Sequence, residues 1–161
     1  MRKTRPTPAK AEPARADDPP SPRPDLIPGS EDFPVVGIGA SAGGLDACIK
    51  LLDALPPATG IAFILVQHLD PTHESMMPEL LAHHTSMTVV QAGDGMRLQR
   101  EHLYIIPPGT YLSLGGGALP LSGPEARHGA RLPFDFLLRS LAEESGERAI
   151  CVILSGTGAD G

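Results

Sequence analysis

The chain has 161 residues, enough for one domain, and its formal net charge is −6. An acidic domain with two tyrosines and no tryptophan is poorly suited to nucleic acid, because contacts to phosphates dominate that affinity. There is no apolar run of about 18 residues that could span a membrane, and no apolar signal core near the start. We therefore expect neither a nucleic-acid partner nor membrane insertion.

The first 34 residues differ in composition from the rest of the chain. They contain nine of the 18 prolines and almost no apolar periodicity. Such a segment cannot bury enough surface to offset the loss of chain entropy on folding. We predict a disordered, Pro-rich arm over residues 1–34 and a compact domain from Val35 onward. The arm is close to neutral, so the domain carries the net negative charge.

The domain opens with a predicted strand over residues 34–40, followed by a glycine-rich turn at residues 41–44. Apolar residues then recur at helical spacing, which predicts a helix that ends before Pro56. These residues are Leu45, Cys48, Ile49, Leu52 and Leu55. The continuous apolar run over residues 61–67 predicts a strand that is covered on both faces.

The middle of the chain alternates in the same way. A second helix is predicted over residues 74–84, in which Pro78 must lie near the first turn or cause a kink. A short strand is expected over residues 87–92. Two further extended segments, residues 101–107 and 110–116, flank a turn that contains two prolines and a glycine.

The last part of the chain adds a helix and a strand. Residues 134–144 are amphipathic, with Phe134, Leu137, Leu138 and Leu141 on one face. Residues 149–155 form the last predicted strand. Alternating helices and continuous apolar strands predict an α/β fold, a three-layer αβα sandwich with a mainly parallel, doubly wound sheet.

The two cysteines, Cys48 and Cys151, lie far apart in the sequence and have no C-x-x-C spacing. Each falls within an apolar segment. We expect both to be core thiols of a cytosolic protein.

Ser41, His68 and Asp160 follow the three most strongly predicted strands. Parallel sheets bind their ligands beyond the carboxyl ends of the strands, so these residues are expected at one edge. A serine hydroxyl is a weak nucleophile that needs a base such as histidine, oriented by a carboxylate. The segment GASAG around Ser41 also fits the G-x-S-x-G nucleophile elbow, whose following helix presents N–H groups to an oxyanion.

Two phosphate-binding motifs are weaker interpretations of the same turn. The segment GIGASA fits a relaxed dinucleotide fingerprint, which also needs an acidic residue about 20 positions on, where Gln67 and His68 stand instead. A phosphate loop needs Lys-Ser/Thr where the chain has Leu45-Asp46.

Other interpretations of the polar residues stay open. His68, Asp70 and His73 could bind a metal, although Asp70-Pro71 favours a turn, and the neighbours His83 and His84 point in different directions on a helix. Ser41 could cap the helix, and His68 could be a hydrogen-bonded structural histidine. Asp160 could accept a hydrogen bond from the backbone of its own turn.

Three segments, GIGASAGG, LVQHLDP and VILSGTGADG, together resemble the catalytic domain of the CheB-type chemoreceptor methylesterases. The likeness spans residues 35–161 and includes the IPPG turn and the segment RLPFDFLLRSLA. The chain order of Ser41, His68 and Asp160 differs from the Ser-Asp-His order of ordinary α/β-hydrolases.

The resemblance implies a protein-glutamate methylesterase of chemotaxis-type signalling, which in many members also deamidates glutamines. Ser41 would be the nucleophile, His68 the general base and then acid, and Asp160 the residue that holds the imidazole. The reaction would pass through an acyl-enzyme without metal or cofactor. Backbone support for the oxyanion is expected at Ala42 and Thr157, where the family often has threonine and methionine.

The resemblance also implies partners and a larger protein. Methylated cytoplasmic domains of chemoreceptors would be the substrates, in the cytoplasm. The motifs QHLDP and SGTGADG are most similar to fused proteins, so a CheR-like methyltransferase domain is expected in the full-length chain. The family continues past the last Asp-Gly pair, so we expect the domain at residues 35–161 to be truncated at its C-terminal side. The alternative is a catalytically idle CheB-like module with a docking or regulatory role.

Overall fold

The structure is a computed structural model, and it describes residues 32–67, 76–123 and 132–154. The main sheet contains β1 (Val35–Ala40), β2 (Ala62–Gln67), β3 (Thr88–Gln91), β5 (His102–Ile105) and β9 (Ala149–Ile153). The helices are α1 (Leu45–Asp53), α2 (Met77–Ala82) and α3 (Pro133–Ser145), with 3-10 turns η1 (Ala42–Gly44) and η3 (Gly146–Arg148). Short strands β4 (Met96–Arg97), β6 (Tyr111–Leu112), β7 (Ala118–Leu119) and β8 (Leu121–Ser122) form two small ribbons.

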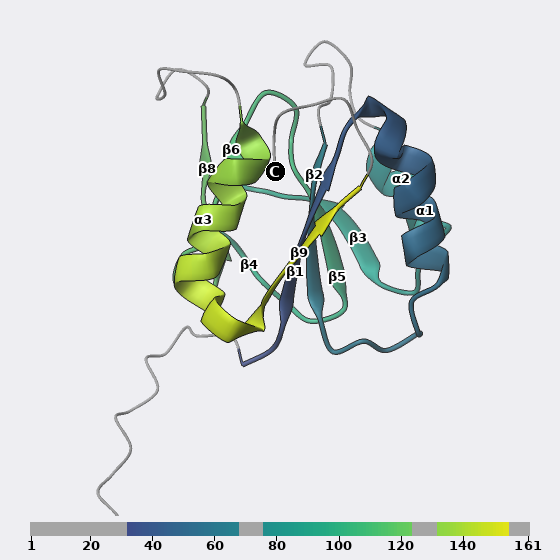
Figure 1. The fold of residues 1–161 in the computed structure, drawn as a ribbon, viewed down its shortest axis with the longest axis horizontal. Helices are drawn as coiled ribbons and strands as arrows, with labels where there is room; N and C mark the ends of the chain where they lie inside the picture. Colours follow the sequence, from purple (N-terminus) through teal and green to yellow (C-terminus); the bar gives the residue numbers. More distant parts are fainter. Residues whose placement is uncertain (1–31, 68–75, 124–131, 155–161) are drawn as a thin grey trace, which may run out of the picture.

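The strands of the main sheet lie in the order β3-β5-β2-β1-β9, and all four pairings are parallel. Helices α1 and α2 cover one face of this sheet and α3 covers the other, which gives three layers (Figure 1). The chain leaves β1 toward β2 on one side and returns as β9 on the other. This arrangement confirms the predicted parallel α/β sandwich and makes the β1–β9 boundary the point where the strand order reverses.

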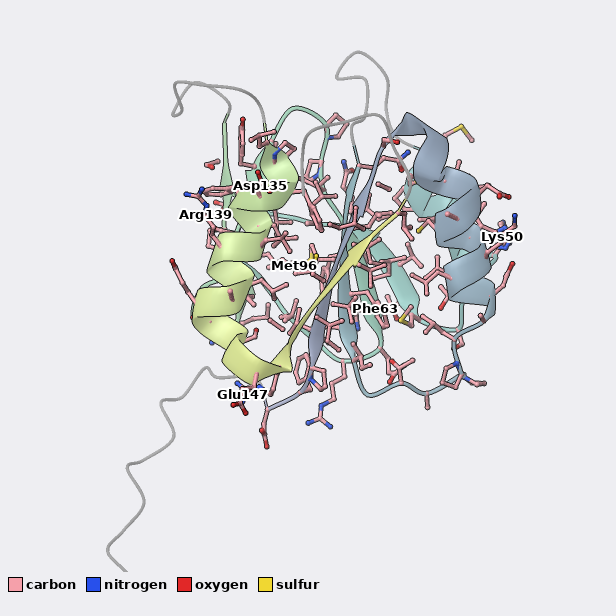
Figure 2. All side chains as sticks on the ribbon, viewed as in Figure 1. Lys50, Phe63, Met96, Asp135, Arg139 and Glu147 are labelled. Atoms are coloured by element: carbon pink, nitrogen blue, oxygen red, sulfur yellow. The ribbon has the colours of Figure 1, made fainter. Side chains whose placement is uncertain are left out.

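Side chains of alternate residues in β1 face different helices. Val36 and Ile38 pack with Leu52 of α1, whereas Gly37 and Gly39 lie under α3. In Figure 2, Phe63 of β2 lies between the sheet and α1. Every residue of β1 and β2 is buried, as the continuous apolar runs predict.

Most element predictions are confirmed, with differences at their ends. Helix α1 stops at Asp53, and α2 begins at Met77 with Pro78 in its first turn, where proline is tolerated. Residues 74 and 75 of the predicted second helix lie outside the described residues. The extended segments around the double-proline turn separate, because β5 joins the main sheet whereas β6 pairs with β8.

The prediction for the two cysteines is half right. Cys48 is buried, and burial raises the pKa of its thiol to about 11. Cys151 is exposed, so the prediction of a second core thiol is wrong. In the part of the chain that the structure describes, β9 is an edge strand paired with β1. Its neighbours Ile150 and Ile153 are 43% and 59% exposed for the same reason.

Residues directly before Val35 also pack on the domain. Phe33 is 5% exposed and belongs to the core on the α3 side. Arg100 lies over the Phe33 ring, 5.2 Å from its centroid, and donates a hydrogen bond to the carbonyl of Asp32. The remainder of the predicted arm, residues 1–31, lies outside the described residues, so the arm stays a prediction.

Candidate active site

The carboxyl ends of β1, β2 and β9 reach one edge of the sheet, which we call the rim. Ala40 at the end of β1 is the register partner of Gln67 at the end of β2. On the other side of β1, Gly39 pairs with Ile153, and the Leu154 N–H donates to the Gly39 carbonyl over 2.8 Å. The three strands therefore end at nearly the same level.

This alignment brings together the starting points of three predicted catalytic segments. Ser41 and His68 are each the first residue after an aligned strand end, and the loop with Asp160 begins beyond Leu154. Ser41 is placed by the structure. His68 and Asp160, together with Thr157, lie outside the described residues, so their side-chain geometry stays a prediction.

Ser41 occupies the sharp turn between β1 and the first helix. Its backbone is extended, with φ −82° and ψ 177°, and its carbonyl accepts a hydrogen bond of 2.8 Å from the Gly44 N–H. Although Ser41 stands at the N-cap position of η1, its side chain makes no capping hydrogen bond. The helix-capping interpretation of this serine therefore has no support from the structure.

The two glycines that flank Ser41 in the elbow, Gly39 and Gly43, differ in their surroundings. A Cβ atom built on Gly39 would lie 2.5 Å from two ring carbons of Phe134, so α3 requires glycine there. A Cβ atom on Gly43 would meet none of the described atoms within 4 Å. Packing within the described residues thus explains the first glycine of the elbow but not the second.

The first helical turns after Ser41 place backbone donors near the rim. N–H groups at the start of a helix have no acceptor within that helix and favour negative charge. Asp46 lies in the first turn of α1 and forms an ion pair with Lys50, with 2.7 Å between Oδ2 and Nζ. Lys50 points outward from α1 in Figure 2, so this pair belongs to the solvated face of the helix.

Gln67 is a polar residue of the rim whose buried acceptor none of the sequence motifs pointed to. It is 8% exposed, and its Oε1 atom is buried without a hydrogen-bond partner in the part of the chain that the structure describes. In the sequence, Gln67 only shows that the acidic residue of a dinucleotide site is missing. Its end position in an otherwise apolar strand is the one signal that could have marked it.

The metal-binding interpretation gains nothing from the described residues. Among them, no group of three or more His, Cys, Asp or Glu side chains could hold an ion. His84 instead bonds Asp53 of α1, with 3.1 Å between Nδ1 and Oδ1. His68, Asp70 and His73 lie outside the described residues. Within the described ranges, no helix is long and apolar enough to cross a membrane.

The fold and the rim define a parallel α/β domain with a serine elbow of the kind that serine hydrolases use. A family model described as CheB methylesterase matches residues 36–161. The chain belongs to the CheB methylesterase family, as the three sequence motifs predict.

Similar proteins agree with this assignment. A protein-glutamate methylesterase/protein-glutamine glutaminase of Pectobacterium atrosepticum is 38% identical over 133 residues, which are 79% of this chain and 37% of that protein. An uncharacterized 104.1 kDa protein of Rhodobacter capsulatus is 45% identical over 85 residues, 53% of this chain and 9% of its own length. The crystal structure of the Thermotoga maritima CheB methylesterase catalytic domain superposes with a TM-score of 0.71 at 27% identity, covering 81% of this chain and 71% of that one. The chain thus spans well under half of these two full-length relatives.

Proposed function

We propose that this protein is a protein-glutamate methylesterase that hydrolyses glutamate methyl esters on the cytoplasmic helices of chemoreceptors. Family membership supports this reaction. The observation that carries it is the alignment of three strand ends around Ser41, since a serine needs a base and a carboxylate from neighbouring loops.

In this proposal, Ser41, His68 and Asp160 act as a triad. The Ser41 hydroxyl attacks the ester carbonyl while His68 takes its proton, and Asp160 holds the imidazole. His68 then protonates the leaving methoxide, which departs as methanol. Water, deprotonated by His68, attacks the acyl-enzyme, releases the glutamate carboxyl group and restores Ser41. No metal or cofactor takes part.

The backbone N–H groups of Ala42 and Thr157 would stabilise the oxyanion in this mechanism. The start of η1 at Ala42, directly after Ser41, supports the first of these roles because a donor there has no helical acceptor. Ala42 and Thr157 replace residues common in the family, and a backbone donor survives a change of side chain.

The same triad would also deamidate glutamine side chains, with ammonia as the leaving group in place of methanol. The printed name of the Pectobacterium relative, which includes protein-glutamine glutaminase, supports this second reaction. The partners would be the methylated cytoplasmic domains of chemoreceptors, in the cytoplasm. A CheR-like methyltransferase domain in the same full-length chain is consistent with the 104.1 kDa relative.

Methanol release from methylated chemoreceptor fragments tests the proposal, with the full-length protein and its Ser41→Ala variant. Removing a triad nucleophile lowers turnover by several orders of magnitude, about 10⁴-fold or more. Ser86→Ala is the matched control, because Ser86 is exposed and precedes β3 at the opposite edge of the sheet, where its hydroxyl bonds the Pro57 carbonyl.

Turnover that is lost with Ser41 and kept with the control supports the esterase. Turnover that survives Ser41→Ala contradicts the triad. A folded full-length protein without any turnover contradicts the enzyme and favours the idle docking module.

A further inference from the structure

Gln67 lies directly beside the strand that carries the predicted nucleophile. It is the register partner of Ala40, the residue before Ser41. Leu65 and Phe63, which lie two and four residues before Gln67 in β2, pack in the same apolar cluster as Ala40. Because side chains alternate along a strand, the Gln67 side chain lies on this face, which α1 and α2 cover.

The amide of Gln67 is not explained by packing. Its Oε1 atom is fully buried and has no hydrogen-bond partner among the described residues, and the residue is 8% exposed. An apolar side chain of the same size would fill this place without leaving a buried acceptor unsatisfied. Within the described ranges, Ser122 Oγ and Arg148 Nε are also buried without a partner, but neither is at the end of β1 or β2. A buried unsatisfied acceptor at the rim calls for a functional reason.

Backbone N–H donors lie in the turn that follows Ala40, the register partner of Gln67. N–H groups at the start of η1 and α1 have no acceptor in their own helix, and Gly44 N–H uses the Ser41 carbonyl. Helix α1 packs on the same face of the sheet as Gln67, so acceptor and donors share one corner of the rim. None of the described atoms would lie within 4 Å of a Cβ atom on Gly43 in this turn.

We propose that Gln67 is a positioning residue for Ser41, an inference that rests on the proposed esterase function. In the reacting enzyme, the Gln67 amide oxygen accepts a hydrogen bond from an N–H group of the turn at residues 41–44. This bond fixes the serine against the ester. Because the bond is absent before reaction, its energy appears in the transition state and raises kcat instead of lowering KM.

The test compares Gln67→Met with wild type in the full-length protein, by methanol release and by thermal unfolding. Methionine keeps the length of the side chain and removes the acceptor. We expect kcat to fall about 10- to 100-fold, as for a misplaced reacting group, with KM within about twofold. The melting temperature stays the same or rises, because the unsatisfied oxygen is gone.

Two further variants separate positioning from packing. Leu65→Met, on the same face of β2, should leave both kcat and the melting temperature nearly unchanged, since this swap conserves volume. Gln67→Glu keeps a side-chain oxygen and should recover part of kcat as the pH rises and the carboxyl group ionises.

A Gln67→Met variant that keeps the wild-type kcat overturns the inference. A variant whose activity falls only in proportion to its fraction of folded protein overturns it as well. If wild type shows turnover that depends on Ser41 but not on Gln67, only the positioning role fails. If wild type shows no turnover that depends on Ser41, the proposed function fails and the positioning role fails with it.

Discussion

Replacing Gly39 with alanine would place a methyl group against the ring of Phe134. The new Cβ would lie 2.5 Å from two ring carbons and 2.9 Å from a third, whereas carbon atoms in contact prefer about 3.5–4.0 Å. The ring cannot easily move aside, because the Phe134 side chain is packed in the core and is only 2% exposed. Either the ring or the start of α3 must move by about 1 Å.

The expected change in the free energy of unfolding combines two opposing effects. Overpacking a buried site typically costs about 1–3 kcal/mol. Alanine also restricts the unfolded chain, which returns about 0.4–1 kcal/mol where the native backbone suits it. Gly39→Ala should therefore destabilise the domain by about 1–2 kcal/mol and lower its melting temperature by about 3–10 °C.

Urea unfolding followed by circular dichroism measures this change, with Gly43→Ala as the control. None of the atoms in the described ranges would lie within 4 Å of a Cβ on Gly43, so this variant should be as stable as wild type or slightly more stable. In a Phe134→Leu background the ring is absent, and the cost of Gly39→Ala should shrink by about 1 kcal/mol. Equal stability of the two alanine variants would refute the packing explanation of the elbow.

Two more predictions concern titrating groups. The Glu101 carboxylate accepts hydrogen bonds from the Gly60 N–H and the Thr59 hydroxyl, and the backbone bond is the main reason that its pKa lies below 4.5. A depressed folded-state pKa stabilises the domain above the unfolded value, and this contribution is lost as the pH falls through the folded-state pKa. Thermal melts between pH 3 and 7 should show Glu101→Gln less stable at neutral pH and less sensitive to acid; parallel curves would contradict this. At pH 8 a thiol reagent should modify Cys151 in the folded protein and Cys48, with its pKa of about 11, only after denaturation. Rapid modification of both thiols in folded protein would contradict the structure.

Periodicity predicts the layers of this fold well because burial decides them. Residues 35–40 and 62–67 are continuous apolar runs, and the strands there are buried on both faces. The exposure of Cys151 depends on the order of strands in the sheet, which an apolar run alone does not encode. The two-residue strands β4, β6, β7 and β8 are too short to produce a period. The sequence predicted an extended segment over residues 110–116, which contains β6, but did not predict the other three.

Only part of the candidate site could likewise be predicted from the sequence. The turn at Ser41 could be predicted, because glycine, serine and a following helix pattern are local signals. That Ser41 and the end of β2 lie side by side follows from strand register, which a strand pattern does not specify. The burial of the Gln67 amide oxygen depends on the packing of α1 over the sheet, and no local sequence pattern indicates it.

The position of β1 between β2 and β9 has a consequence for local opening of the chain. A strand bonded on both sides and covered on both faces separates from its neighbours only when most of the domain unfolds. The turn after it, in which Gly43 is exposed, can open at lower free energy than the strand. Ser41 thus lies at the boundary between a strand that opens only with the whole domain and a turn that opens more readily.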